Sequence, residues 1–257
     1  MSTITLTFGE VAENHRGMQK IGNGVVDSGF NLNEMEMAKL KFEEKGYKCD
    51  YVRLDQDCKI EEHKLEEASV LVIRDGVKAL IDTDADEVFK EQIGLVWDSK
   101  AYMYGRVVEK RARHNLCYGD QDQKADYENK KGTIVSWDRI PYTKKLRDNL
   151  EQFFGSKAHL LQGEGNLYYD IKKCGIGFHG DTERRIVIAV RLGASLPLHY
   201  QWFYKGKSIG NRIELNINHG DVYVMSDKAT GQDWKKRNIP TLRHAAGCKK
   251  FTTIKQK

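Results

Sequence analysis

The sequence predicts an α+β fold, in which a double-stranded β-helix (jelly roll) follows an N-terminal α/β region. Strand-like and helix-like patterns alternate through the first 98 residues, whereas the chain after residue 155 reads as a series of short strands almost without helices. The composition, 40% hydrophobic and 10% aromatic, is typical of a chain with an ordered core.

The N-terminal region combines strands with helices. Residues 2–8 alternate between apolar and polar side chains, as a strand does. Residues 33–36 match a capping box that would open a helix with Leu40 on one face, and Gly46 is suited to end that helix in a left-handed conformation. Further strands are predicted at residues 47–54 and 69–74, and a short helix at 84–93.

The remainder begins with a polar, basic stretch, residues 101–136, which we expect to form a long structured loop or ribbon. A helix is predicted from Pro141 to Gly155, with Leu146, Leu150, Phe153 and Phe154 on one face. Turn residues then separate a series of strands, a pattern that favours a sandwich or a jelly roll. These strands are predicted at residues 158–162, 165–170, 175–179, 185–191, 198–204, 211–217, 221–225 and 249–255.

The net charge of +5 is divided unevenly along the chain. Residues 1–98 contain 12 Lys and Arg against 21 Asp and Glu, whereas residues 99–257 contain 30 against 16. We therefore divide the chain into an acidic region of unassigned role, 1–98, and a basic jelly-roll domain, 99–257. The asymmetry suggests a polyanionic partner for the basic part, although the two parts could instead simply neutralise each other.

Several observations bear on the compartment. No stretch approaches the roughly 18 consecutive apolar residues of a membrane helix, and the first eight residues alternate like a strand rather than forming a signal peptide. The five cysteines include no C-x-x-C pair, which favours reduced thiols over disulfides or a zinc site. We expect a soluble intracellular protein of the cytoplasm or nucleus, without a membrane partner. The oligomeric state stays open.

A histidine and an aspartate in the strand series form the strongest candidate site. His179 and Asp181 are two residues apart, so both side chains leave an extended segment on the same face. A distant second histidine would complete the 2-His-1-carboxylate triad of a non-haem Fe(II) oxygenase. His244 follows 65 residues after His179, enough for several strands to travel round a jelly roll. His219-Gly-Asp221 has the same spacing, but it lies too close to His244 and is better interpreted as a turn.

Residues from about 101 to 257 resemble the AlkB-type branch of the Fe(II)/2-oxoglutarate-dependent dioxygenases. The similarity rests on four motifs in the family's order. They are Asn166-Leu-Tyr168 for N-x-Y, His179-Gly-Asp-Thr-Glu183 for H-x-D-x-E, the strand at 219–225 before His244, and residues 249–255 for the closing R-x-N-x-T-x-R. Both closing arginines are lysines here, and lysine offers a carboxylate a point charge rather than two parallel hydrogen bonds.

The resemblance implies a metal, a cosubstrate and a reaction. It implies that 2-oxoglutarate binds beside Fe(II), with its distal carboxylate held by a lysine of the last strand. The reaction would be oxidative demethylation or hydroxylation of an alkylated base in DNA or RNA, as in DNA repair. The implied metal ligands are His179, Asp181 and His244, and the implied cosubstrate residues are Asn166, Tyr168, Lys249 and Lys255.

The basic ribbon is similar in position to the family's nucleotide-recognition lid. Guanidinium and ammonium groups there would neutralise phosphates, and an aromatic side chain could stack on an extruded base. The simpler interpretation is a solvated basic loop. The candidate substrate residues are Arg106, Lys110, Arg111, Arg113, Tyr118, Phe178 and Glu183.

Two alternative functions remain open at this point. The same chemistry could act on a protein side chain or a small molecule, and salt-dependent binding to nucleic acid would distinguish this case. The chain could also be a non-catalytic jelly-roll binding protein, although such a protein has no need of all three candidate metal ligands.

Overall fold

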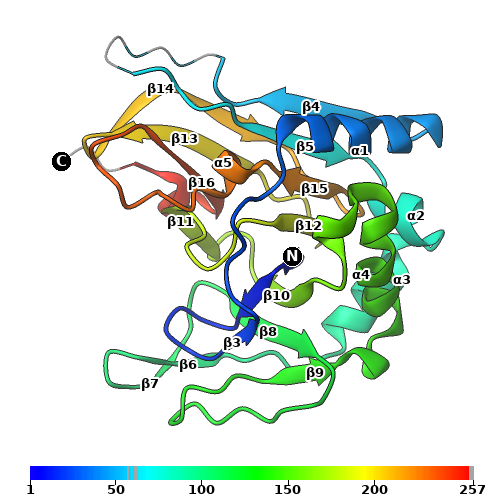
Figure 1. Cartoon of the computed structure of the whole chain (residues 1–257). Coiled ribbons are helices and arrows are strands. Elements are labelled where there is room, and N and C mark those ends of the chain that lie inside the picture. Colours follow the sequence, from blue (N-terminus) through cyan, green and yellow to red (C-terminus); the bar gives the residue numbers. More distant parts are fainter. Residues whose placement is uncertain (57, 59, 61–62, 255–257) are drawn as a thin grey trace.

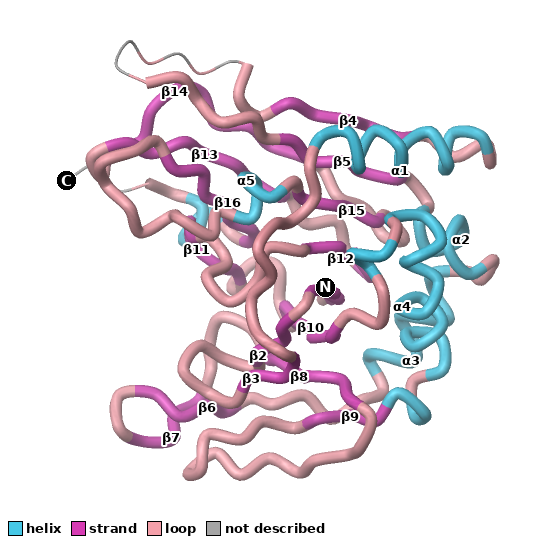
Figure 2. Tube along the Cα trace, in the orientation of Figure 1, coloured by secondary structure: helices cyan, strands magenta, loops and turns pink. Residues whose placement is uncertain are grey.

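The computed structural model describes residues 1–56, 58, 60 and 63–254 and has a mixed α+β fold in which strands predominate (Figure 1). The predicted α+β class is confirmed. Two sheets share a buried core, and helices cover the opposite face of the larger sheet (Figure 2). No helix in the described part of the chain has the length and apolar character needed to cross a lipid bilayer.

The large sheet contains, among the described residues, eight strands in the order β4-β5-β15-β12-β1-β10-β8-β9. All neighbours are antiparallel except β8 and β9. The bounds are β1 Thr3–Gly9, β4 Cys49–Arg53, β5 Ser69–Ile73, β8 His114–Gly119, β9 Ile134–Ser136, β10 Gln162–Tyr168, β12 Val187–Gly193 and β15 Val222–Met225.

The small sheet has the order β11-β16-β13-β14. Its strands are β11 Gly175–His179, β13 Leu198–Tyr204, β14 Lys207–Leu215 and β16 Thr241–Gly247. Two separate ribbons pair β2 (Val11–Glu13) with β3 (Lys20–Gly22) and β6 (Lys100–Met103) with β7 (Arg106–Glu109).

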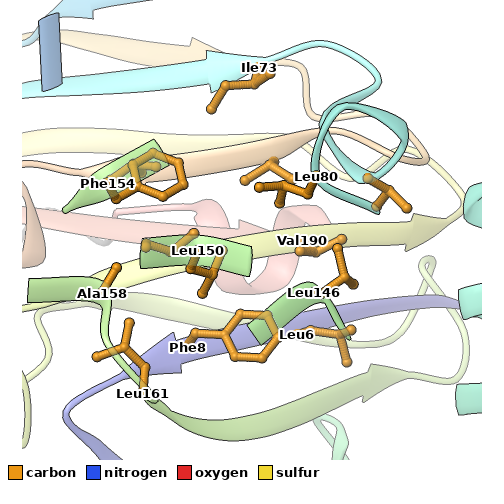
Figure 3. Packing of buried hydrophobic residues seen from close by; sticks show 14 of the residues in the cluster. Leu6, Phe8, Ile73, Leu80, Leu146, Leu150, Phe154, Ala158, Leu161 and Val190 are labelled. Carbon is orange, nitrogen blue, oxygen red and sulfur yellow. The ribbon is translucent and has the colours of Figure 1, made fainter. Parts of the chain in front are cut away.

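The helices α1 (Leu32–Glu44), α2 (Gly76–Ile81), α3 (Ala85–Ile93) and α4 (Pro141–Phe154) pack on one face of the large sheet. Leu6 and Phe8 of β1 join Leu146 and Leu150 of α4 in one buried cluster (Figure 3). Shorter helical turns are α5 (Asp227–Thr230), α6 (Lys249–Thr252), η1 (Trp137–Arg139) and η2 (Ser156–Ala158).

The other face of the large sheet packs on the small sheet. Side chains alternate along a strand, so Thr5 and Thr7 of β1 point away from the helices that cover Leu6 and Phe8. The core between the sheets draws on the same face of the neighbouring strands, including Val187, Ala189, Tyr223 and Met225, together with Leu198, Tyr200 and Trp202 of β13.

The strongest helix prediction is confirmed. Helix α4 begins at Pro141, and Gly155 follows it with a φ of 77°. Helix α1 exists as predicted but begins two residues earlier, because Asn31 and Glu34 form the capping box. Leu40 is 49% exposed, and the helix buries Met35, Ala38 and Phe42 instead.

The predicted last strand, residues 249–255, is wrong for its described part. Residues Lys249–Thr252 form helix α6, and Lys255 lies outside the described residues. The place in the large sheet between β10 and β12 is occupied by β1, from the opposite end of the chain. The predicted strand at 158–162 is likewise absent: η2 and a short connection lead into β10.

The boundary predicted at residue 98 does not separate two structural units. Strands β1, β4 and β5 of the acidic region lie in the same sheet as β10, β12 and β15 of the basic region. Residues 1–98 therefore contribute directly to the architecture around the candidate site.

Candidate metal centre

The three predicted metal ligands converge on one point. His179 ends β11, His244 lies opposite it on β16, and Asp181 follows β11 by two residues. One ligand atom from each lies within 4.8 Å of the other two. The Asp181 Oδ1 atom is 3.6 Å from Nε2 of both histidines. The predicted triad is therefore assembled in space, with all three donor atoms facing one another.

A close backbone contact fixes the position of Asp181. The backbone N–H of Asp181 donates to the carbonyl of Thr230 at 2.9 Å. A Cβ atom added at Gly180 would overlap the carbonyl oxygen of Gly231, so only glycine allows the two segments to approach this closely. The turn after β11 is thus held against the end of α5, and Asp181 points back toward the histidines.

The hydrogen bonds of His179 leave one ring nitrogen free for a metal. Its Nδ1 lies 2.8 Å from the Gly177 carbonyl and 3.1 Å from the His244 carbonyl, so Nδ1 carries the proton and donates to them. Nε2, which faces Asp181, is then an unprotonated acceptor. A backbone carbonyl behind a ligating histidine is the usual arrangement that orients such a ring.

The protonation states also suit a metal. Burial and the neighbouring His244 lower the pKa of His179 to about 3, so the ring is neutral at physiological pH. Burial alone would raise the pKa of Asp181, but the hydrogen bond from His244 and the nearby charges of His244 and Arg184 outweigh it and lower the pKa. A neutral imidazole and an ionised carboxylate are forms that bind a divalent ion. The donor set fits such an ion.

The triad opens into a cavity of about 460 Å³ between the two sheets. That volume lies in the range of small-molecule sites. The large sheet contributes side chains from five neighbouring strands, and residues 13–16 and 234–235 contribute others. The large-sheet side chains that line the cavity are Thr5, Thr7, Asn115, Glu164, Asn166, Tyr168, Val187, Arg191, Tyr223 and Met225.

An arginine surrounded by carboxylates borders the metal side of the cavity. Arg184 is 3% exposed and lies 2.7 Å from Glu164, 3.1 Å from Glu183 and 3.8 Å from Asp181. Burial, followed by the charge of Asp181, raises the pKa of Glu183. The predicted substrate residue Glu183 therefore lies in the cavity, where Arg184 is already bound to it.

Comparison with known proteins shows that the chain is similar to a viral protein. It is 46% identical over 252 residues to the uncharacterized protein R156 of Acanthamoeba polyphaga mimivirus, and the alignment covers 97% of each protein. The chain belongs to the family of this mimivirus protein. No protein-family model matches it.

In this member of the mimivirus protein's family, the predicted cosubstrate residues divide into two groups. Asn166 and Tyr168 of β10 line the cavity, and the Asn166 Oδ1 atom accepts hydrogen bonds from Arg113 and Asn115. Lys249, in contrast, is exposed on α6 and does not line the cavity. Its predicted role is wrong, because the strand that would have carried it inward is a helix.

The predicted substrate residues are also divided. Arg113 and Phe178 line the cavity, whereas Arg106 and Arg111 are exposed outside it. Lys110 is 7% exposed, and its ammonium group donates to Asn14 and Asn115, so its prediction as a phosphate contact is wrong.

Tyr118 is a further correction. It is fully buried, its hydroxyl donates to Gln92, and its ring packs against Trp137, so it cannot stack on a base. The predicted turn at His219 is confirmed: Asp221 accepts from Arg74 and from the backbone N–H of Asn218, and it takes no part in the triad.

Sequence reasoning missed Arg191, a buried side chain in the wall of the cavity. It is the single charged residue of strand β12, Val187–Gly193, whose other residues are apolar or glycine. A lone arginine within an apolar strand is the signal that could have identified it, because such a charge is buried only with a reason.

Proposed function

We propose that the chain is an Fe(II)- and 2-oxoglutarate-dependent dioxygenase with a double-stranded β-helix core. The observation that carries this proposal is the convergence of His179, Asp181 and His244 on the wall of a cavity between the two sheets. Three protein ligands on one side of a metal leave positions open for small molecules, whereas structural zinc sites close with four.

The strand connectivity supports the jelly-roll interpretation. From β10 to β16 the chain passes back and forth between the large and the small sheet, with β13 and β14 as the one consecutive pair that stays in the same sheet. In the small sheet β16 lies between β11 and β13, and in the large sheet β1 lies between β10 and β12. A core of two opposed sheets built in this order matches a double-stranded β-helix.

Several residues of the chain would have distinct roles in this reaction. His179, Asp181 and His244 hold the metal, and Asn166 and Tyr168 contact 2-oxoglutarate on the large sheet. With the metal bound, 2-oxoglutarate and O₂ supply one oxygen atom to a substrate C–H bond and leave succinate and CO₂. Arg184 holds Glu164 and Glu183 in position beside the triad.

We propose a nucleobase in DNA or RNA as the substrate. The support is a group of aromatic and cationic side chains at the rim of the cavity, which we term the small-sheet surface. Arg243 stacks over Phe203 at 4.1 Å and lies 5.3 Å from Trp234, and Arg212 lies 5.2 Å from the Phe178 ring. Aromatic rings stack on exposed bases, and the cations bind phosphates. The surface consists of Phe178, Arg212, Trp234, Lys235 and Arg243, and the buried Phe203 supports it beneath Arg243.

The test is anaerobic titration of the whole chain with Fe(II) and then 2-oxoglutarate, followed by addition of O₂ with methylated oligonucleotides. We expect one Fe(II) per chain, succinate formation, and loss of a methyl group detected by mass spectrometry. Succinate formation without any change in the oligonucleotides would favour a protein or small-molecule substrate. Absence of both metal binding and succinate would contradict the dioxygenase proposal and favour a binding protein.

A further inference from the structure

The N-terminal strand completes the wall of the cavity opposite the metal. Strand β1 pairs with β10 on one side and with β12 on the other. Thr5 is in register with Asn166 across the first pairing and with Arg191 across the second, and Asn166 is in register with Asn115 on β8. These four polar side chains therefore form one row across the centre of the sheet, facing the cavity.

Arg191 is the charged member of this row. Its side chain is 1% exposed, and Nη1 donates to the Thr5 hydroxyl. Its Nε has no hydrogen-bond partner in the described part of the chain, and no carboxylate among the described residues pairs with its guanidinium. Arg184, which also lines the cavity, is different, because three carboxylates surround it.

A buried guanidinium without an anion is energetically unfavourable. Removing such a group from water costs several kcal/mol unless a counter-charge and hydrogen bonds replace the lost hydration. Among the described residues, the Thr5 hydroxyl accepts one hydrogen bond from the Arg191 guanidinium. Its other N–H groups stay available to a ligand in the cavity. Arg113, whose Nε donates to Asn166, adds a second guanidinium to the same wall. This end of the cavity is therefore cationic and suited to an anion with planar acceptor geometry.

We infer that Arg191, oriented by Thr5, binds a carboxylate of a small-molecule ligand in the cavity. On the proposed function, on which this identification rests, the group is the distal carboxylate of 2-oxoglutarate. The anchor then comes from the middle of the large sheet and is supported by the first strand of the chain, instead of coming from lysines at the C-terminus. The cosubstrate would lie between the triad and the row of Arg191, Thr5 and Asn166.

The experiment is calorimetric titration of the Mn(II)-loaded chain with two probes, 2-oxoglutarate and 2-oxopentanoate, which lacks the distal carboxylate. Mn(II) does not react with O₂ under these conditions, so the readout is binding and not turnover. The variants are Arg191→Met, Arg191→Lys and Thr5→Val. The matched control is Arg185→Met, because Arg185 pairs with Asp227 and does not line the cavity.

We expect Arg191→Met to weaken 2-oxoglutarate binding by at least ~30-fold, since a charged hydrogen-bonded partner is lost. Binding of 2-oxopentanoate and of Mn(II) should change less than about threefold, because neither uses the guanidinium. Arg191→Lys should lose less affinity than Arg191→Met, and Thr5→Val less still, at about threefold to tenfold. Arg185→Met should behave as the wild type.

The outcomes separate the two proposals. The role of Arg191 would be overturned if Arg191→Met bound 2-oxoglutarate with the wild-type affinity, or if it lost affinity equally for 2-oxoglutarate and 2-oxopentanoate. The dioxygenase proposal would stand in either case. If the wild type binds neither Mn(II) nor 2-oxoglutarate, the dioxygenase proposal fails and the cosubstrate role of Arg191 fails with it. Thermal unfolding of each apo variant checks the fold, and Arg191→Met should be at least as stable as the wild type because it removes an unpaired buried charge.

Discussion

Arg191 donates a hydrogen bond to Thr5, although the two residues are 186 positions apart in the chain. Their strands are neighbours in the large sheet, and both side chains face the cavity that contains the candidate metal ligands. The N-terminal strand is therefore part of the site. Deleting residues 1–98 would remove the centre and one edge of the large sheet, so such a truncation cannot report on the basic part alone.

The first prediction concerns metal-dependent stability. A ligand that binds only the folded state stabilises it by about 2.7 kcal/mol at a concentration one hundred times its dissociation constant. Mn(II) or Fe(II) under anaerobic conditions should therefore raise the unfolding temperature of the wild type by several degrees, and a chelator should reverse this. In His179→Ala and His244→Ala the shift should disappear.

His219→Ala is the control for this measurement. His219 belongs to the second H-x-D sequence and lies near Asp84 and Asp86, on the exposed start of α3. Its variant should retain the full metal-induced shift. If the metal-induced rise in unfolding temperature persisted in both triad variants and disappeared in His219→Ala, the metal would bind at Asp84, Asp86 and His219. The assignment to the triad would then be wrong.

The second prediction tests the backbone contact that positions Asp181. Gly180→Ala places a methyl group against the backbone of Gly231, and backbone can give way only by moving the turn. We expect a loss of at least about 2 kcal/mol in unfolding free energy and a metal affinity at least tenfold weaker. Chemical denaturation and Mn(II) titration measure the two effects.

Gly177→Ala is the matched comparison, three residues earlier on β11. The nearest atom to a Cβ there is the carbonyl oxygen of Phe251, at 3.6 Å, an ordinary contact. This variant should lose less than about 1 kcal/mol and bind metal normally. Equal effects of the two substitutions would show that the approach of Gly180 to Gly231 is not what positions Asp181.

Much of the site could be predicted from sequence because its signals are local. The spacing of His179 and Asp181 places both side chains on one face of any extended segment, and the distance to His244 favoured a strand from another part of the fold. Helix α4 was equally accessible, since its apolar side chains follow a helical period up to Gly155. The His179–Asp181 pair and helix α4 could therefore be predicted from residues close together in the chain, and His244 from its separation in sequence.

The rest of the fold and of the site depends on the pairing of strands that are far apart in the chain. Nothing within residues 2–8 indicates that this strand lies between β10 and β12, because strand patterns specify a face and not a neighbour. The error over Lys249 has a similar origin, because residues 249–252 form a helix in place of the predicted strand. Lys110 and Tyr118 were misassigned because a basic, aromatic stretch was interpreted as a surface. In the structure both are buried, and Asn14 and Gln92 from other segments accept their hydrogen bonds.

The third prediction follows from the burial of Lys110. Burial lowers its pKa to about 7 from the 10.5 of a solvated lysine. Above pH 7 the folded state loses this proton while the unfolded state keeps it, so the unfolded state binds more protons and stability rises with pH. Below pH 7 both states are protonated, and the cost of burying the charge is present in full.

The unfolding free energy should therefore gain roughly 2–3 kcal/mol from this group between pH 6 and pH 9. Lys110→Met removes the titrating amine. The unfolding free energy of the wild type should therefore rise relative to that of the variant over that interval. Urea denaturation at a series of pH values measures it. A difference that stays constant with pH would show that Lys110 is solvated in solution.

The last prediction concerns the small-sheet surface. Two of its cations, Arg212 and Lys235, are exposed, and replacing them does not disturb the metal ligands. In the double variant Arg212→Gln, Lys235→Gln, oligonucleotide binding should weaken about equally for all sequences, because phosphate contacts carry no sequence information. The slope of log affinity against log salt should fall by about 1.5, since each neutralised phosphate contributes 0.7 to 0.9. Metal affinity should stay unchanged, which separates substrate binding from damage to the metal site. The double variant Arg106→Gln, Arg111→Gln carries the same change in net charge outside the cavity and should have the smaller effect. The opposite order would move the nucleic-acid path to the basic ribbon, and equal salt slopes in all three proteins would remove the case for a nucleic-acid substrate in favour of a protein or small molecule.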